Sequence, residues 1–387
     1  MRSLIRISAA MALISVTYVG CNNVSFEAVP PTSCSNVNSA YGDGSCEIKN
    51  NFIKYDYSVT LGNVDILFVD DNSGSMYVEQ EKMANQFPGF LDSISTLNYQ
   101  IAITSTDVAK TAAGTKGQFF DFGNGQKILK NSSRIKDSTH YDNITKFQNT
   151  IKRSETLQCP NGAACPSGDE RGIYALNLAI DRSENAPFFR SGGHLAVVIL
   201  SDEDERSTGG GAPGSEINGG AIGSSYKAED LDLPRTFVQK YGMQLKGAKS
   251  ISVHSIIIKP ATAISNADSS CWSQQNNQSG GVKGYYGTQY AALSVPSAEL
   301  KAMAPIMQGT LGSICSSNYT QEMGQIASFL NQKSLALPCQ PEDGSLEVSF
   351  TPAQPGVSTS IDSDNVLRFS PYIAAGVKVN LKFDCRM

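Results

Sequence analysis

Two short apolar runs, each followed at once by acidic and hydroxyl side chains, constrain the fold of this chain more than any other feature. VDILFV (64–69) leads into DDNSGSM, and HLAVVIL (194–200) leads into SDEDE. Short, nearly continuous apolar runs are typical of strands buried on both faces of a parallel sheet. Ligands of such sheets bind at the carboxyl ends of the strands, so the two acidic loops are expected to meet at one edge.

Helical patterns alternate with the strands. Further strands are expected at 99–105 and 249–258, and apolar side chains recur at helical spacing in 76–94, 170–182 and 227–246. This alternation predicts an α/β fold, with a doubly wound, mostly parallel sheet flanked by helices. After residue 335 short strands alternate without helices, which predicts a small antiparallel β appendage at the carboxyl terminus.

These patterns divide the 387 residues into four expected segments. A signal peptide over 1–20 precedes a polar tether with a small disulfide loop over 21–60. The α/β domain spans 61–333 with an insertion at about 108–153, and the β extension spans 334–387. The net charge of −5, without a basic run carrying interleaved aromatics, argues against nucleic acid as a partner.

The amino terminus is typical of an export signal. Arg2 and Arg6 precede an apolar stretch over 7–19 that is too short to span a bilayer. The following Tyr-Val-Gly-Cys21 resembles a bacterial lipobox, which implies that Cys21 becomes the lipidated first residue, although lipoboxes usually have Leu in place of Tyr18. Asn22 lacks the inner-membrane retention pattern, so an outer-membrane address is preferred. An ordinary cleaved signal peptide is the alternative.

Cysteine usage agrees with export. Nine cysteines are present, and removing Cys21 leaves eight, an even number that predicts disulfides and an oxidising compartment. Spacing suggests the pairs Cys34–Cys46, Cys159–Cys165, Cys271–Cys315 and Cys339–Cys385. On the order of 100 connectivities remain open. Zinc binding by Cys159 and Cys165 is a weak rival, because no second CxxC accompanies them.

The loop after the first strand is rich in oxygen donors. Asp71, Ser73 and Ser75 form a D-x-S-x-S pattern, in which Gly74 allows a tight backbone path. A carboxylate and two hydroxyls are hard donors suited to Mg²⁺, Ca²⁺ or Mn²⁺. Asp202, at the end of the other strand, would supply a second carboxylate.

This constellation resembles the metal-ion-dependent adhesion site of the von Willebrand factor A family. The likeness is strongest at DNSGSM and VVILSDEDE, extends over about residues 61–333, and includes YYGTQYAALS, MQGTLGSIC and TQEMGQIASFL. The tail also resembles the β extension of bacterial lipoprotein members. The resemblance implies that Asp71, Ser73, Ser75 and Asp202 hold the cation, directly or through water.

One ligand departs from the family pattern. Where the family has Thr, ahead of Ala175-Leu176, this chain has Glu170. A third carboxylate would tighten cation binding, favour Ca²⁺, or fill the position of an external acidic ligand. Ser167 or Asp169 would replace it in another loop register. Asp107 and Asp204 are candidates outside the inner shell, and Glu203 and Glu205 are interpreted as solvated acids.

The expected function is protein recognition by a lipid-anchored protein of the bacterial envelope, and not catalysis. The family resemblance implies a partner that contributes an acidic residue to the cation. A scaffold lipoprotein whose metal only rigidifies the loops is the first alternative. A hydrolase using Asp71, Asp202 and Glu170 around a metal-bound water is the second, although no nucleophile or histidine base is evident.

Overall fold

The computed structural model describes residues 45–386 with internal gaps. The gaps are 50, 61, 110–114, 132, 158–165, 167–169, 191–192, 206–228, 245–249, 262–267, 278–284, 304–305, 332–334, 338, 362–365, 371–372 and 374–376. The expected signal peptide and Cys21 lie outside the described residues. None of the described helices is long and apolar enough to cross a membrane.

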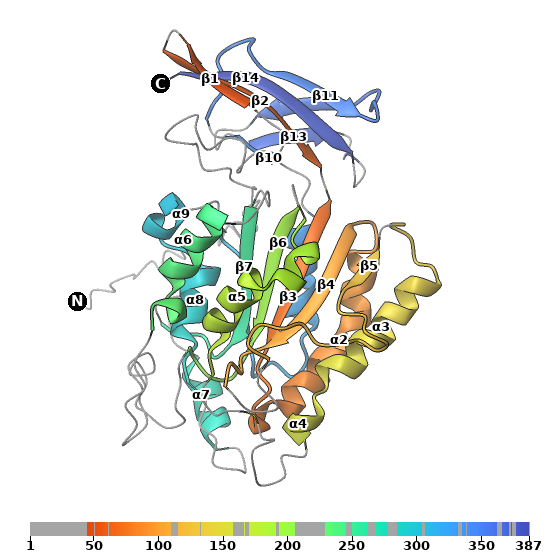
Figure 1. The fold of residues 1–387 in the computed structure, drawn as a ribbon, viewed down its shortest axis with the longest axis vertical. Helices are drawn as coiled ribbons and strands as arrows, with labels where there is room; N and C mark the ends of the chain where they lie inside the picture. Colours follow the sequence, from red (N-terminus) through yellow and green to blue (C-terminus); the bar gives the residue numbers. More distant parts are fainter. Residues whose placement is uncertain are drawn as a thin grey trace, which may run out of the picture.

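A seven-stranded sheet forms the centre of the molecule, as expected for a doubly wound α/β fold (Figure 1). Its order is β5-β4-β3-β6-β7-β8, with β9 also paired to β7, and only the β4–β5 pair is antiparallel. The strands are β3 (Asn63–Asp70), β4 (Asn98–Ser105), β5 (Leu129–Asn131), β6 (His194–Leu200), β7 (Ser250–Ile257), β8 (Ile306–Met307) and β9 (Leu311–Ser313).

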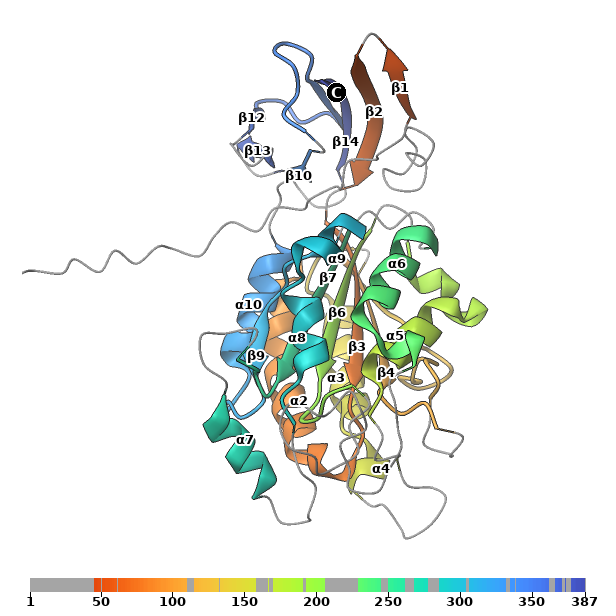
Figure 2. The ribbon, with the colours of Figure 1, turned by 90° about the vertical axis from the view of Figure 1, so that its left-hand side faces the viewer.

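Helices cover both faces of the sheet, because successive side chains of each strand point to opposite sides. Ile66 and Phe68 of β3 face one apolar core, whereas Leu67 and Val69 face the other. The first core is covered by α2 (Tyr77–Ser93), α3 (Ser138–Ile151) and α10 (Thr320–Leu330). The second is covered by α5 (Gly172–Asp181), α6 (Pro234–Gln244), α8 (Thr288–Ser294) and α9 (Ala298–Met303) (Figure 2).

The remaining helices are short. They are α4 (Ser154–Leu157), α7 (Ser269–Asn276), and the 3-10 turns η2 (Gly74–Met76), η3 (Ser183–Phe188) and η5 (Asp230–Asp232). The segment expected as an insertion at 108–153 contributes β5 to the sheet edge and α3 to the first core, where Phe147 and Ile151 are fully buried. This segment is therefore part of the packed domain.

A separate β module lies at the amino-end side of the central sheet (Figure 1). One sheet has the order β1-β2-β14-β11 and the other β10-β13-β12, and all pairs are antiparallel. The strands are β1 (Ser45–Lys49), β2 (Phe52–Thr60), β10 (Leu335–Ala336), β11 (Glu347–Thr351), β12 (Ser358–Ile361), β13 (Val366–Ser370) and β14 (Lys378–Arg386). They share an apolar core that includes Tyr55, Tyr57, Leu367, Leu381 and Phe383.

The structure differs from the expected tether over 21–60, because β1 and β2 belong to the β module. Strand β2 pairs with β14 along its whole length, so the module is built from both ends of the chain and the α/β domain lies between them. Tyr55 and Tyr57 are buried while Lys54 and Asp56 are exposed. This period of two marks a strand with one wet face, which the polar composition concealed.

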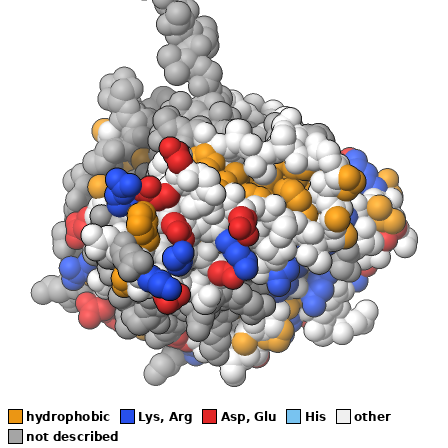
Figure 3. All heavy atoms as spheres, turned by 90° about the horizontal axis from the view of Figure 1, so that it is seen from above, with side chains coloured by type: hydrophobic (Ala, Val, Ile, Leu, Met, Phe, Trp, Pro, Cys, Tyr) orange, Lys and Arg blue, Asp and Glu red, His pale blue; other side chains and the backbone are white. Residues whose placement is uncertain are grey.

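Charges of both signs are interspersed on the β module (Figure 3). Ion pairs join Lys54 to Asp384 and Lys382 to Asp56, each at 3.2 Å between nitrogen and oxygen. Such exposed pairs contribute little stability. Because positive and negative side chains are interspersed, the described residues on this face of the β module form no patch of a single charge sign.

Two of the expected disulfides are present in the described residues. Cys271 bonds to Cys315 and Cys339 bonds to Cys385. Cys46 is also disulfide-bonded. Cys34, Cys159 and Cys165 lie outside the described residues, so their pairing stays a prediction.

Two histidines lie in the core as one hydrogen-bonded chain. His194 Nε2 is 2.8 Å from Ser252 Oγ, which is 2.8 Å from His254 Nε2, and His254 Nδ1 is 3.0 Å from Thr310 Oγ1. The pKa of each histidine is lowered to about 3, by burial for both and by the nearby His254 in addition for His194. Both imidazoles are therefore neutral in the folded protein at neutral pH.

The histidine pair predicts a loss of stability in mild acid. An unfolded histidine takes up its proton near pH 6.5, so between that pH and about 3 the unfolded state binds more protons and gains free energy. At pH 5 each histidine is expected to lower the free energy of unfolding by about 2 kcal/mol. Urea unfolding at pH 7 and at pH 5 measures this loss. In His254→Gln the loss caused by the two histidines should be about half as large as in the unaltered protein.

The buried carboxylates do not confuse this comparison. A carboxyl whose folded pKa is raised gains stability as pH falls, which is the opposite sign, and it does so equally in both proteins. An identical pH dependence in His254→Gln and the unaltered protein would show that His254 is charged in the fold or does not titrate there.

Candidate metal centre

The two acidic loops lie side by side at the carboxyl edge of the central sheet. Strands β3 and β6 are parallel neighbours, and Asp70 is opposite Leu200 in the register. The backbone N–H of Asp71 continues the ladder by donating to Leu200 O at 3.0 Å. From β3 the chain proceeds to β4 on one side, and from β6 to β7 on the other. The loops therefore flank the topological switch point, where α/β sheets bind ligands.

The D-x-S-x-S loop and the loop after β6 are joined by side-chain hydrogen bonds. Asp71 Oδ1 accepts from Ser73 N at 2.9 Å, and Asp71 Oδ2 accepts from Ser201 Oγ at 2.7 Å. Ser73 Oγ is 3.1 Å from Ser75 Oγ, which donates to Asp202 Oδ1 at 3.2 Å. The structure thus brings together Asp71, Ser73, Ser75 and Asp202.

Glu170 enters the same region from the start of α5. Its Oε2 accepts from Thr106 Oγ1 at 2.6 Å, and the neighbouring Arg171 N donates to Thr106 O at 3.2 Å. The side chain is fully buried, yet Glu170 Oε1 has no hydrogen-bond partner. Ser167 and Asp169, the alternatives for this position, lie outside the described residues.

Burial raises the pKa values of all three carboxyls, and repulsion by neighbouring acids raises those of Asp202 and Glu170 further. Burial is the largest cause for Asp71, Asp202 and Glu170. The charge of Asp71 is the next cause for both Asp202 and Glu170, and Glu203 raises the pKa of Glu170 further. A bound cation would relieve this repulsion, and such shifted groups in one place are typical of functional sites.

The donor set fits a hard divalent cation. Across the described part of the chain, no three Asp, Glu, His or Cys side chains converge closely enough to hold a metal by themselves. A site here must therefore include the hydroxyls of Ser73 and Ser75 beside the carboxylates. Oxygen donors of this mixture, with the unpartnered oxygen of Glu170, suit Mg²⁺, Ca²⁺ or Mn²⁺.

The acidic run after β6 is buried, which corrects the expectation that Glu203 and Glu205 are solvated. Glu205 and Asp204 contact two different helices. Glu205 Oε2 and Oε1 accept from Ile173 N at 2.7 Å and Tyr174 N at 3.0 Å, at the start of α5. Asp204 Oδ1 accepts from Gln289 N at 2.9 Å, at the start of α8. Burial and the nearby Asp232 raise the pKa of Glu205.

Asp107, the other candidate outside the inner shell, is also fully buried. Its Oδ1 accepts from Ala109 N at 2.8 Å, and its charge adds to the repulsion that raises the pKa of Glu170. The structure therefore places Asp107 in the loop after β4, beside the ligand set rather than within it.

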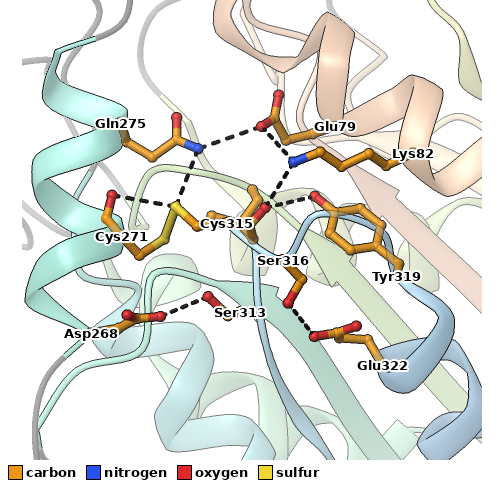
Figure 4. Close-up of a disulfide and its surroundings, with 11 residues drawn as sticks. Glu79, Lys82, Asp268, Cys271, Gln275, Ser313, Cys315, Ser316, Tyr319 and Glu322 are labelled. Atoms are coloured by element: carbon orange, nitrogen blue, oxygen red, sulfur yellow. Dashed lines mark hydrogen bonds and ion pairs between the residues drawn. A yellow bond between two sulfur atoms is a disulfide. The ribbon is translucent and has the colours of Figure 1, made fainter.

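Glu79 is a buried acid near the site that the sequence patterns did not single out. It lies in the first turn of α2, and its charge raises the pKa of Asp202. Its Oε1 is 3.6 Å from Lys82 Nζ and accepts from Gln275 Nε2 at 3.4 Å (Figure 4). Gln275 lies on α7, which the Cys271–Cys315 disulfide holds to the segment before α10.

Comparison with known proteins finds distant structural likeness only. No family model and no curated protein sequence matches this chain. The pilus adhesin SpaC from Lactobacillus rhamnosus GG aligns with a TM-score of 0.35 at 10% identity, covering 89% of this chain and 43% of that one. A von Willebrand factor type A protein from Catenulispora acidiphila aligns with a TM-score of 0.33 at 13% identity, covering 90% and 66%.

Proximal thread matrix protein 1 from the mussel byssus, with a zinc-occupied MIDAS motif, aligns with a TM-score of 0.34 at 13% identity. That alignment covers 72% of this chain and 50% of the mussel protein. The chain spans about half or less of the first adhesin and mussel proteins it matches, 43% and 51% of their lengths. Likeness at these scores assigns no function to this chain.

Proposed function

We propose that the carboxyl edge of the central sheet binds one divalent cation and that the surface around the cation recognises a protein. Asp71, Ser73, Ser75, Asp202 and Glu170 would hold the cation. The hydrogen-bonded path from Ser73 through Ser75 to Asp202 is the observation that supports this most directly, because it converges donors from two strand ends at one point.

Electrostatics support a cation over a purely structural cluster. Three carboxyls are buried together, burial raises the pKa of each, and neighbouring acids raise the pKa values of Asp202 and Glu170 further. Burying such groups without a counter-charge is costly. Mg²⁺, Ca²⁺ or Mn²⁺ would offset that cost.

Separate observations bear on protein recognition and on location in the envelope. Tyr77, two positions after Ser75, is half exposed and would contact a partner beside the cation. The two described disulfides agree with an oxidising compartment. Lipidation of Cys21 and an outer-membrane anchor complete the proposal and follow from the lipobox resemblance alone.

Glu170 is proposed to close the site from within. In the resembling family a partner's acidic residue completes the cation shell, and here the buried carboxyl of Glu170 would take that position. Glu170→Thr should therefore open a coordination position for an external carboxylate. We expect a glutamate-containing peptide to bind Glu170→Thr at least about tenfold tighter than the unaltered protein when Mg²⁺ is present, because one added contact of about 1.4 kcal/mol gives that factor.

Calorimetric titration of the peptide checks this prediction. The gain in peptide affinity should disappear in excess EDTA, which removes the cation. It should also disappear in the Asp71→Ala/Glu170→Thr double variant, which no longer binds the cation. Peptide binding that is unchanged by Glu170→Thr would show that Glu170 does not occupy the position of the external ligand.

The deep burial of Asp71, Asp202 and Glu170 favours a second candidate, a scaffold whose cation only rigidifies the loops. Removing the cation would then lower thermal stability but leave partner binding intact. Hydrolysis is the least supported function. His194 and His254 are committed to the core, and His140 Nε2 lies 2.8 Å from Asp92 Oδ1, so no histidine base serves the site.

A further inference from the structure

The amino end of α5 is held by groups from three other parts of the fold. Its first backbone N–H groups have no partner within the helix. Arg171 N donates to Thr106 O after β4, and Gly172 N donates to Tyr290 Oη of α8 at 3.1 Å. Ile173 N and Tyr174 N donate to the Glu205 carboxyl after β6. Four successive donors are thus satisfied by groups from the loops after β4 and β6 and from α8.

Glu205 connects the segments that carry two proposed ligands, Asp202 and Glu170. It follows Asp202 by three positions in one buried loop, and Ile173 follows Glu170 by three positions. The two hydrogen bonds from α5 therefore fix the Glu170 backbone relative to the Asp202 backbone. Glu205 and Ile173 are fully buried and Tyr174 is partly buried, so the contact with Ile173 N at least is shielded from water.

The other side of Glu170 is anchored as firmly. Arg171 Nε and Nη2 donate to Asp232 Oδ1 and Oδ2 at 2.8 and 3.0 Å, and the guanidinium lies 3.8 Å from the ring centre of Tyr174. Gly172 is required here, because a Cβ would come within 2.9 Å of Tyr290 Oη. Glu170 thus precedes a turn of helix that has little freedom to move.

We propose that Glu205 is a positioning residue that fixes the separation of Glu170 and Asp202 and so sets how strongly the site discriminates Mg²⁺ from Ca²⁺. This inference rests on the proposed cation site. Mg²⁺ demands near-ideal octahedral geometry at short distances, whereas Ca²⁺ accepts longer and less regular ligands. A shell that loses its fixed spacing therefore loses more Mg²⁺ affinity than Ca²⁺ affinity.

The test is calorimetric titration of the full-length protein with Mg²⁺ and with Ca²⁺, beside Glu205→Gln. The glutamine nitrogen cannot accept a hydrogen bond, so one of the two α5 donors loses its partner. We expect Mg²⁺ to bind about tenfold or more weakly, the range found when a residue supporting a metal ligand is replaced. Ca²⁺ affinity should fall by clearly less, so the ratio of the two affinities shifts toward Ca²⁺.

Asp65→Asn is the matched control. Asp65 is another buried carboxyl that accepts from a backbone N–H, that of Arg190 at 2.8 Å, but it lies at the amino end of β3, away from the site. It should lower the melting temperature without changing the Mg²⁺ to Ca²⁺ ratio. If Glu205→Gln does not fold, Tyr290→Phe removes only the acceptor of Gly172 N and should shift the ratio in the same direction, by less.

The outcomes separate this inference from the function on which it rests. If every variant that folds, Glu205→Gln or Tyr290→Phe, keeps the same ratio as Asp65→Asn, the positioning role is wrong and the cation site stands. If the unaltered protein binds neither cation, both proposals fail together.

Discussion

Asp202→Asn is expected to abolish cation binding and, at the same time, to make the metal-free protein more stable. The asparagine can still accept from Ser75 Oγ, so the local hydrogen bond survives. It removes a carboxyl whose pKa is raised by burial and by the charges of Asp71 and Glu79. Because a raised folded pKa means that the ionised form is disfavoured in the fold, the substitution removes a cost at neutral pH.

Thermal melts in EDTA and in excess Mg²⁺, Ca²⁺ or Mn²⁺ measure both effects. At a cation concentration of one hundred times Kd, binding stabilises the unaltered protein by about 2.7 kcal/mol. Asp202→Asn should show none of this gain, but in EDTA its stability should exceed that of the unaltered protein by about 1 kcal/mol, a common size for a single stabilising substitution. The exposed Asp142→Asn should change neither value, and a full cation-induced gain in Asp202→Asn would refute the ligand set.

Phe147→Ala is expected to cause the largest loss of stability in the α/β domain. The Phe147 ring stacks on Phe87 of α2, with centroids 3.5 Å apart and planes at 5°, and meets Phe68 of β3 edge-on at 4.8 Å. All three rings are buried. Removing a phenyl ring from such a core costs about 3–5 kcal/mol through lost burial and a residual cavity.

Urea unfolding measures that loss, and Tyr141→Ala provides the matched control. Tyr141 lies on the same helix, α3, with 59% of its surface exposed, so its removal should change stability by less than about 0.5 kcal/mol. Equal, small effects from the two substitutions would mean that α3 does not pack against the sheet.

The central strands were predictable because both of their faces are buried. Runs expected at 64–69 and 194–200 correspond to β3 (Asn63–Asp70) and β6 (His194–Leu200). Parallel pairing then places the loops that follow them at the same edge. For that physical reason Asp202 could be expected to meet the loop of Asp71, Ser73 and Ser75, although 127 positions separate it from Ser75.

Other parts of the structure depend on contacts that no local pattern reveals. The sequence suggested that Glu205 is a solvated acid and that Asp204 lies outside the inner shell of ligands. Their partners are backbone donors 31 and 85 positions away, which no local pattern indicates. Strand β2 has the alternation of a half-buried strand, but its partner β14 lies at the other end of the chain. The strand assignment of such a polar segment becomes clear only once the strand that pairs with it is known.

The most direct test of the cation site is calorimetric titration of the metal-free, full-length protein with Mg²⁺, Ca²⁺ and Mn²⁺, run beside Asp71→Ala. Asp71 contacts both loops through Ser73 and Ser201, so its loss should remove the site while leaving the fold. We predict one cation per chain for the unaltered protein and none for Asp71→Ala. Equal binding by the two proteins, or no binding by the unaltered one, would contradict the proposed cation site.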